Sequence, residues 1–575
     1  MLLVDPHPLL DEPGLRADVQ AIGALNGRRG TGVVRLDGAP ESVDGLAWRL
    51  EGNFSKGAAL ETPDYPLENT GIEEWNAGAA ARMRWDDSVV EVSLRHNDLV
   101  NGICSCIRND SPEQFFAQIE NQQPNGVELY RVDYDIERPY QDVTHDLAMI
   151  RGGTRFAEVG ELHSTYAFQT NRRKEYEIVR QAVDGPQFDF QLDTHTLDAD
   201  FDHSRVTLAD GLELSGTWGM SGRFQENVYS GLPLIPNYRS YGAGVFGIER
   251  LDLDGVEVSV GGRYDHLSQE AFLDESAYAR HRARGTLEPD ACSVAGEVAS
   301  CPTSFDTGSV TLGGAVPLGE ALVAKLDLST ASRFPTIDEL YINGTAPTMP
   351  VLAIGDPSLG AETSYGASAT LDLDDGWISG QASVFGSFID DYIYFAPELD
   401  PDGAPIFDVL IRGAYPRFSY RPVDATFWGG EASVLLRFEP FELESRAAWV
   451  RGRDVDGGGD LEWVPPDRSR VALTYHPPGV GVLERPFATV SGDYVAEQTH
   501  YDSTTDLSSP PPAYALVGLA VGSDLEIDGQ RFRASIEVEN LLDERYRDYT
   551  SLLKYFADEP GRQVFLRLGA TVDLM

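Results

Sequence analysis

Metal-ligand chemistry is the first possibility that the side chains of this sequence suggest. Carboxylates and imidazoles, which are common ligands of metal ions, are concentrated between residues 193 and 203. They are Asp193, His195, Asp198, Asp200, Asp202 and His203. Side chains alternate between two faces of a strand, so the aspartates at 198, 200 and 202 would share one face and the histidines the other. This spacing favours a row of carboxylates over a metal site, and we predict no bound metal.

Three further histidines are candidates for contact with a ligand such as haem or a metal complex. They are His266, His281 and His500. The first two belong to a polar, loop-like stretch that also carries two cysteines, and the third belongs to another such stretch. Residues 454–460 resemble half of a calcium-binding loop, but the glutamate that completes such a loop is missing at the required spacing. We interpret 454–460 as a solvated loop.

The four cysteines form two local pairs, Cys104 with Cys106 and Cys292 with Cys301. An even count in local pairs indicates disulfides made in an oxidising compartment. Cys292 and Cys301 are spaced to close a short loop, whereas Cys104 and Cys106 would make a strained ring. Four unrelated free thiols remain an alternative. Zinc is disfavoured, because neither pair has the usual two-residue spacing or a nearby pair of histidines.

No arrangement of residues indicates catalysis. A nucleophile elbow, a phosphate-binding glycine loop and a zinc motif are all missing from any fitting strand–helix context. The net charge of −47, from 92 acidic and 45 basic side chains, excludes a general nucleic-acid binder, because phosphate contacts need an excess of Lys and Arg. We predict a protein that is not an enzyme and carries no cofactor.

The elements that would position these residues are strands. Apolar and polar residues alternate with a period of two, as in 256–265, 367–384 and 564–574, and long helical periodicity is nearly absent. Each run is about ten residues long, which is the length that crosses a bilayer when the strand is tilted. No run of about 18 apolar residues occurs, so a transmembrane helix is not expected.

Short turns alternate with long polar connections along the chain. The short turns lie near 37–45, 86–87, 159–160, 210–211, 254–255, 317–320, 374–376, 439–440, 477–483 and 528–529. The long connections include 103–141, 172–191, 266–306, 335–362, 390–424 and 496–512. We therefore predict an all-β, transmembrane antiparallel β-barrel of about 22 strands, with short periplasmic turns and long extracellular loops. A propeller is disfavoured because no repeat of about 40 residues is present.

Two stretches resemble the barrel signature of TonB-dependent outer-membrane receptors. The first is 332–341 with 355–359 and 362–364, and the second is 538–546 with 560–562, which is similar to the family's C-terminal box. The signature positions are Arg333, Phe334, Pro335, Glu339, Leu340, Gly355, Asp356, Pro357, Leu359, Glu362, Asn540, Leu541, Asp543, Tyr546, Gly561 and Arg562. We interpret them as structural. Asn540 and Asp543 suit a turn, and Arg333 and Glu339 are expected to pair in the polar lumen.

The resemblance implies a bacterial outer-membrane protein, with a short segment at 1–15 and the barrel at 16–575. Members of the family also have an N-terminal plug domain through which TonB acts. We expect no plug and no signal peptide in this sequence, so coupling to TonB would need a plug supplied from elsewhere. A truncated or decayed receptor is the alternative. The chain also ends in Leu574 and Met575 instead of the family's terminal aromatic residue.

The resemblance further implies uptake of a scarce, bulky nutrient, such as a ferric siderophore, haem, cobalamin or another metal complex. Selectivity would then lie in the extracellular loops. The expected partners are outer-membrane lipid, lipopolysaccharide and a small bulky ligand, with no nucleic acid, and we expect a monomer. Two alternatives remain open: a passive wide pore, whose lumen charge biases permeation, and a surface-exposed binding protein with long acidic loops.

Overall fold

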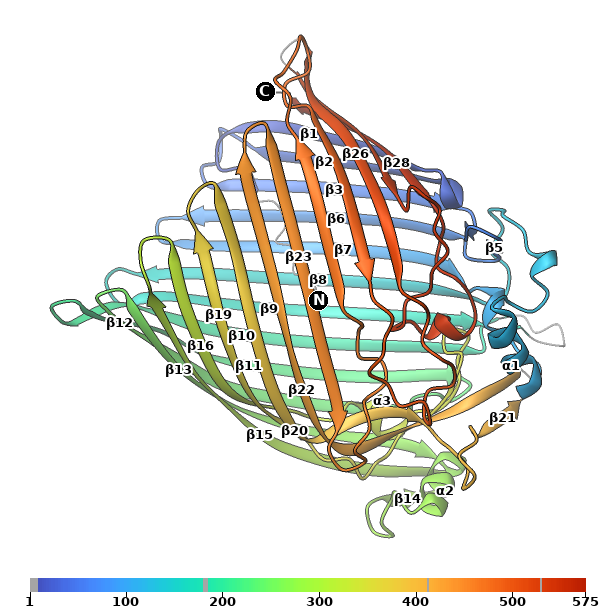
Figure 1. The fold of residues 1–575 in the computed structure, drawn as a ribbon. Helices are drawn as coiled ribbons and strands as arrows, with labels where there is room; N and C mark the ends of the chain where they lie inside the picture. The colour runs from blue at the N-terminus through green and yellow to red at the C-terminus, as the bar shows by residue number, and fades with distance from the viewer. Residues whose placement is uncertain (1–8, 179–184, 411–412, 528–529, 575) are drawn as a thin grey trace.

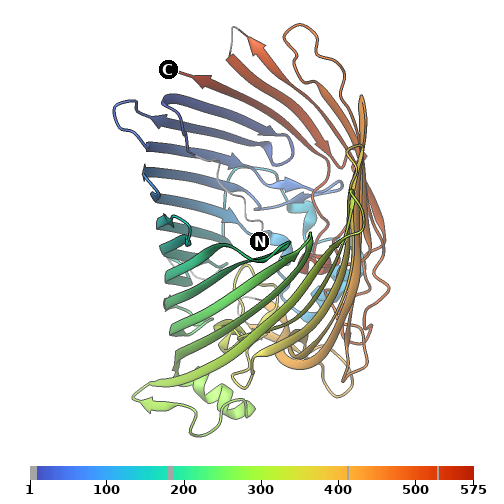
Figure 2. The ribbon, with the colours of Figure 1, turned by 90° about the vertical axis from the view of Figure 1, so that its left-hand side faces the viewer.

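The computed structural model describes residues 9–178, 185–410, 413–527 and 530–574. These residues form a closed antiparallel barrel of 22 strands (Figure 1). Consecutive barrel strands pair in chain order, and the first closes on the last, with Val19 of β1 (Gly14–Ala24) opposite Ala570 of β28 (Gln563–Asp573). Figure 2 looks in from the side of the short turns and shows β1, in blue, beside β28, in red. The predicted fold class and strand number are confirmed.

The barrel strands fall into two halves along the chain. The first half comprises β1 (Gly14–Ala24), β2 (Arg29–Ala39), β3 (Leu46–Gly57), β6 (Ile72–Trp85), β7 (Ser88–Gly102), β8 (Tyr140–Phe156), β9 (Gly160–Tyr176), β10 (Phe188–Ala209), β11 (Leu212–Gly231), β12 (Asn237–Leu253) and β13 (Val256–Asp274). The second half comprises β15 (Val298–Pro317), β16 (Leu322–Arg333), β19 (Glu362–Asp374), β20 (Ile378–Pro397), β22 (Gly413–Phe438), β23 (Phe441–Asp454), β24 (Arg468–Tyr475), β25 (Phe487–Val495), β26 (Tyr514–Ile527), β27 (Gln530–Glu539) and β28 (Gln563–Asp573).

The remaining elements belong to the extracellular loops. The helices are η1 (Asn26–Arg28), η2 (Ser105–Ile107), α1 (Pro112–Asn121), η3 (Val127–Leu129), α2 (Glu275–Arg284), α3 (Ile337–Tyr341) and η4 (Leu552–Tyr555). The short strands are β4 (Leu60–Glu61), β5 (Pro66–Leu67), β14 (Ser293–Ala295), β17 (Asn343–Gly344), β18 (Leu352–Ile354) and β21 (Phe407–Leu410). No helix among the described residues is long and apolar enough to span a bilayer.

Alternation along each strand separates a lipid-facing surface from the lumen. Large apolar side chains are exposed at every second position, as Val258 and Val260 are on β13 and Leu566 and Leu568 are on β28. The residues between them point into the lumen, because side chains of a strand alternate between its two faces. This is the pattern that a barrel wall between lipid and water requires.

The strands are longer than the sequence pattern predicts. They range from 8 residues in β24 to 26 in β22, against about ten expected. The extra length is on the extracellular side, where polar side chains pair across the outer face, as Arg172 does with Asp189 at 2.7 Å. Backbone hydrogen bonding between strands continues wherever a neighbouring strand is available. Because both faces of these extensions carry polar residues, the sequence there shows no alternation of apolar and polar residues that would predict a strand.

Three expected connections are therefore shorter than predicted. The segments 172–191, 266–306 and 390–424 are reduced to connections at 177–187, 275–297 and 398–412. The turn expected at 528–529 lies outside the described residues.

Candidate functional site

Extracellular loops from both ends of the chain meet in one apolar cluster, which we call the roof core. Its buried members are Tyr65, Leu67, Cys104, Cys106, Phe115, Val351, Phe418, Leu507, Tyr555, Phe556 and Ala557. The ring of Phe115 in α1 lies 5.3 Å from that of Phe407 and 5.7 Å from that of Phe556, measured between centroids. Burial of these rings holds the loops together where no strand pairing does so.

Local sequence explains why α1 forms at this point. Ser111 caps the helix by accepting a hydrogen bond from the backbone N–H of Gln114, and Pro112 occupies the first turn. Gln122 ends the helix in the left-handed conformation. On the buried face, the side-chain amide of Gln118 donates to the main-chain oxygens of Cys106 and Phe556, each at 3.0 Å. The helix thus links the two ends of the chain.

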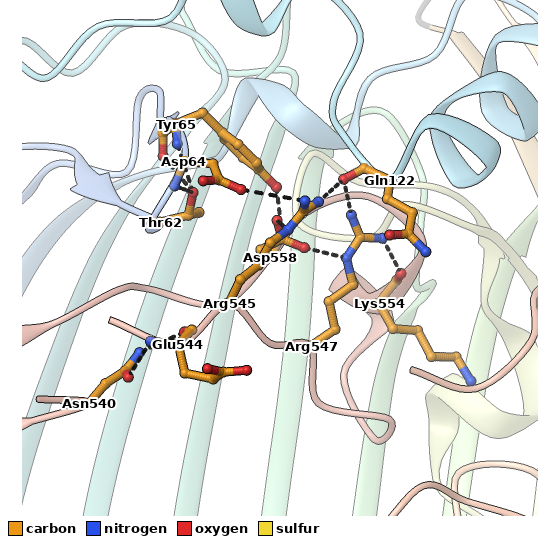
Figure 3. Close-up of polar contacts among 10 residues, drawn as sticks. All are labelled: Thr62, Asp64, Tyr65, Gln122, Asn540, Glu544, Arg545, Arg547, Lys554 and Asp558. Carbon is orange, nitrogen blue, oxygen red and sulfur yellow. Dashed lines mark hydrogen bonds and ion pairs between the residues drawn. The ribbon is translucent and has the colours of Figure 1, made fainter. Parts of the chain in front are cut away.

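A polar network joins the β27–β28 loop to the N-terminal loops (Figure 3). The buried carboxylate of Asp558 accepts hydrogen bonds from Nε of Arg545 and of Arg547, each at 2.6 Å. Both guanidinium groups also donate to the main-chain oxygen of Gln122. The backbone N–H of Asp558 donates to the hydroxyl of Tyr65 at 2.8 Å, and burial raises the pKa of Tyr65 to about 12. The network around Asp558 therefore connects three loops.

A buried ion pair lies next to the roof core. The side chains of Lys554 and Asp506 are fully buried, and Nζ of the lysine is 2.8 Å from Oδ2 of the aspartate. This Nζ also lies 4.2 Å from the ring centroid of Trp463 and 3.8 Å from that of Tyr549, within cation–π range. Burial lowers the pKa of Lys554 and raises that of the neighbouring Glu462 to about 7. Three loops meet around one cation.

The short helix α3 is anchored to the barrel wall by Arg333. Its Nη1 lies 2.9 Å from Oε2 of Glu339, and its Nε lies 2.9 Å from Oε1 of Glu362. Thr336 and Glu339 form a capping box, in which the glutamate accepts from the backbone N–H of Thr336 at 2.7 Å. The expected pair of Arg333 and Glu339 is present, at the extracellular end of β16, and Glu362 completes it.

Close backbone approach accounts for two signature glycines. A Cβ on Gly355 would lie 2.5 Å from a backbone nitrogen of α3, and one on Gly561 would lie 2.7 Å from Oδ1 of Asp543. Asn540 and Asp543 have positive φ angles of 48° and 58°. The side chain of Asn540 bonds to the backbone N–H and the carbonyl of Glu544. These residues build turns, which is the role the sequence suggests.

A luminal cavity of about 520 Å³ lies beneath α3, against strands β10 to β15. Ser240 and Gln269 are buried neighbours on β12 and β13, and Oγ of the first and Nε2 of the second have no hydrogen-bond partner among the described residues. The cavity is also lined by ring surface from Tyr238 and Phe334. Strand β11 contributes Arg223, Gln225 and Asn227. A cavity of this size and chemistry can hold an organic ligand.

The three histidine candidates lie on separate elements. His266 lies in β13 and not in a loop as predicted, and its Nδ1 is 2.9 Å from Oδ1 of Asp306 on the outer face. His281 is buried in α2 against the ring of Tyr341, and burial lowers its pKa to about 4. His500 is exposed in the loop between β25 and β26. None of them lines the luminal cavity.

The aspartate row of β10 lies on the inner face, and the structure adds a residue that sequence reasoning missed. His163 of β9 lies opposite Asp200, and ligand atoms of His163, Asp200 and Asp202 are all within 4.8 Å of one another. The pairing register of two strands creates this group, so no local spacing reveals it. We assign no metal to it, because its members are partly exposed carboxylates and an imidazole in an aqueous lumen.

Both cysteine pairs are disulfide-bonded in the structure. Cys292 precedes β14 and Cys301 lies in β15, so their bond closes the hairpin that follows α2. Cys104 and Cys106 flank the start of η2 within the roof core.

The family model described as "TonB dependent receptor-like, beta-barrel" matches residues 50–541. The chain therefore belongs to this family of outer-membrane receptors and transporters, and it is not an enzyme. No curated protein sequence matches it.

Solved structures show the same fold at low sequence identity. The copper transporter OprC has a TM-score of 0.74 and 14% identity, over 99% of this chain and 82% of that one. The FrpB iron transporter from Neisseria meningitidis has a TM-score of 0.71 and 13% identity, over 98% and 82%. The siderophore receptor PirA from Acinetobacter baumannii has a TM-score of 0.68 and 13% identity, over 98% and 81%.

Proposed function

We propose that this chain is the barrel of a receptor that takes up a scarce, bulky nutrient, such as a ferric siderophore, haem, cobalamin or another metal complex. The luminal cavity beneath α3 carries the proposal. It combines ring surface with amide, hydroxyl and guanidinium groups directly below the packed loops. The names of the three structural neighbours, a copper transporter, an iron transporter and a siderophore receptor, support the same class of cargo.

The roof core favours a receptor over a passive wide pore. The five rings buried in the roof core would have to separate before a large solute could pass that part of the mouth, at a cost on the order of 1.5–3 kcal/mol for each ring exposed. Active uptake would use TonB through a plug domain. In the membrane the barrel would contact lipid and lipopolysaccharide as a monomer.

Uptake assays in a strain that lacks the gene test this proposal. Complementation with the native protein should restore TonB-dependent accumulation of one radiolabelled complex from a panel of iron, copper and cobalamin complexes. Arg223→Gln in the cavity should reduce that uptake at least fivefold. Arg437→Gln, another exposed luminal arginine that lies outside the cavity, should reduce it less than twofold. Uptake that persists without TonB would instead support the passive pore.

A further inference from the structure

A hollow in the outer surface of the barrel wall lies across β15, β16, β19, β20 and β22 (Figure 1). It has a volume of about 750 Å³. Strand register places one row of its lining residues side by side, in the order Leu312, Leu328, Ala367, Gly386 and Trp428. Because Ala367 and Gly386 are small and adjacent, the wall is low between the larger side chains of Leu328 and Trp428.

Alternation along the strands places this row on the lipid side of the wall. Leu312, Leu328 and Trp428 are 48%, 45% and 40% exposed, and Val384, two positions from Gly386 on the same face, is exposed as well. A Cβ on Gly386 would have no atom within 4 Å, so the space above this residue is open. Since the hollow faces away from the lumen, it does not depend on what the lumen contains.

The hollow lies in the half of the wall that faces the outer leaflet. On β22, the exposed rings of Trp428 and Phe438 are ten positions apart, which is about the length of strand that crosses a bilayer. Phe438 ends β22 at a short periplasmic turn, so Trp428 belongs to the aromatic girdle of the extracellular interface. Above the hollow the outer face becomes polar, where the hydroxyls of Ser332 and Thr363 lie 3.0 Å apart.

Hydrocarbon from the bilayer would have to fill this hollow, because an empty space would deprive its lining of dispersion contacts. An acyl chain is flexible and narrow, so it can lie over Ala367 and Gly386, between Leu328 and Trp428, while its headgroup stays at the polar rim. The depth of the hollow assigns the chain to a lipid of the outer leaflet.

The rim beside the hollow suits a phosphorylated headgroup. Arg453 of β23 lies opposite Thr426 of the lining, is exposed, and donates from Nη2 to the main-chain oxygen of Gly458 at 3.1 Å. Within the described part of the chain, no carboxylate forms an ion pair with it. Asp390 and Asp424 add two carboxylates on β20 and β22. A guanidinium group binds phosphate directly, and divalent cations join carboxylates to phosphates, so both kinds of rim residue can contact one headgroup.

We propose that this hollow binds one acyl chain of lipid A, the phosphorylated glycolipid part of lipopolysaccharide, and that Arg453 contacts a lipid A phosphate. The site goes beyond the proposed function, since it lies on the outer wall and requires no cargo. It would fix a single lipid molecule at one place on the circumference of the barrel.

Native mass spectrometry of the purified full chain in detergent, titrated with lipid A in the presence of Mg²⁺, tests the proposal. Gly386→Leu should weaken binding at least fivefold, because the new side chain fills the hollow. The matched variant Gly262→Leu adds the same side chain to the lipid face of β13, where a Cβ would lie 4.0 Å from its nearest neighbour, and should change binding less than twofold.

Two further titrations test the headgroup. Arg453→Gln should weaken binding of lipid A at least threefold and leave binding of dephosphorylated lipid A unchanged. Phosphatidylethanolamine should bind the native protein at least fivefold more weakly than lipid A does. Equal binding of the two lipids, or equal sensitivity of both lipid A forms to Arg453→Gln, would overturn the assignment to lipid A.

Folding of each variant is checked by heat-modifiable electrophoretic mobility and circular dichroism. Gly386→Leu adds apolar surface, so non-specific adsorption of lipid predicts unchanged or stronger binding by this variant, and that result would overturn the site. A native dimer that Gly386→Leu dissociates would assign the hollow to a second copy of the chain instead. Uptake assays do not depend on this surface, so the two proposals can fail separately.

Discussion

Replacing Lys554 with methionine should open the roof core. The lysine and Asp506 are fully buried and pair at 2.8 Å. Methionine keeps most of the side-chain volume and the contact with the aromatic rings, but it leaves the aspartate buried without its cation. Removing one partner of a buried ion pair destabilises a protein by about 3–5 kcal/mol.

The loss should be local, because the barrel ladder does not depend on this pair. By the relation of about 1.4 kcal/mol per tenfold change, the open population of the surrounding loops should rise by roughly two to three and a half orders of magnitude. Hydrogen exchange followed by mass spectrometry measures this change in peptides from 455–467, 496–513 and 540–562. Peptides from the barrel strands should exchange as they do in the native protein.

Two companion variants decide whether the reasoning is right. Lys56→Met removes an exposed lysine that pairs with Glu73 at 2.7 Å, and it should leave exchange in the loops unchanged. The double variant Lys554→Met/Asp506→Leu should recover most of the lost protection, because it removes both buried charges. The argument is refuted if Lys554→Met accelerates loop exchange no more than Lys56→Met does.

Three further outcomes are expected. The pKa of Glu462 is about 7 in the folded loops and 4.5 when exposed, so the folded state binds the proton more tightly. The roof core should thus lose stability as pH rises from about 4.5 to 7, by up to about 1.4 kcal/mol per pH unit. Hydrogen exchange of the loop peptides, corrected for the intrinsic pH dependence of exchange, measures this loss, and Glu462→Gln should abolish it. Changing Cys292 and Cys301 to serine should destabilise the hairpin after α2 by roughly 2–3 kcal/mol, visible as faster proteolysis at 275–297 while barrel mobility is unchanged. Arg333→Lys should release α3 by about 1–2 kcal/mol, because one ammonium group cannot pair with both carboxylates in fork geometry; unchanged exchange at 334–361 would contradict this role.

The barrel could be predicted because its signals are local. Alternation with a period of two and the positions of short turns depend on neighbouring residues. Together they are enough to predict the 22 strands and the two faces of the barrel wall. The signature turns are local as well, since Asn540, Asp543 and Gly561 adopt or permit backbone geometry that other residues resist. The sequence pattern underestimates strand length and places His266 in a loop, although it lies in β13. The reason is that the strand ends beyond the bilayer are polar on both faces and do not alternate between apolar and polar residues.

The chemistry inside the barrel and beneath the loops depends on contacts between distant parts of the chain. Lys554 and Asp506 are 48 residues apart, and each alone reads as an ordinary charged loop residue. His163 reaches Asp200 through strand register, and Arg16 meets Asp573 only because β1 closes on β28. The sequence by itself therefore determined the wall, its turns and its two faces. Only the tertiary structure decided which charges are buried or face one another, because ring closure and loop packing set those distances.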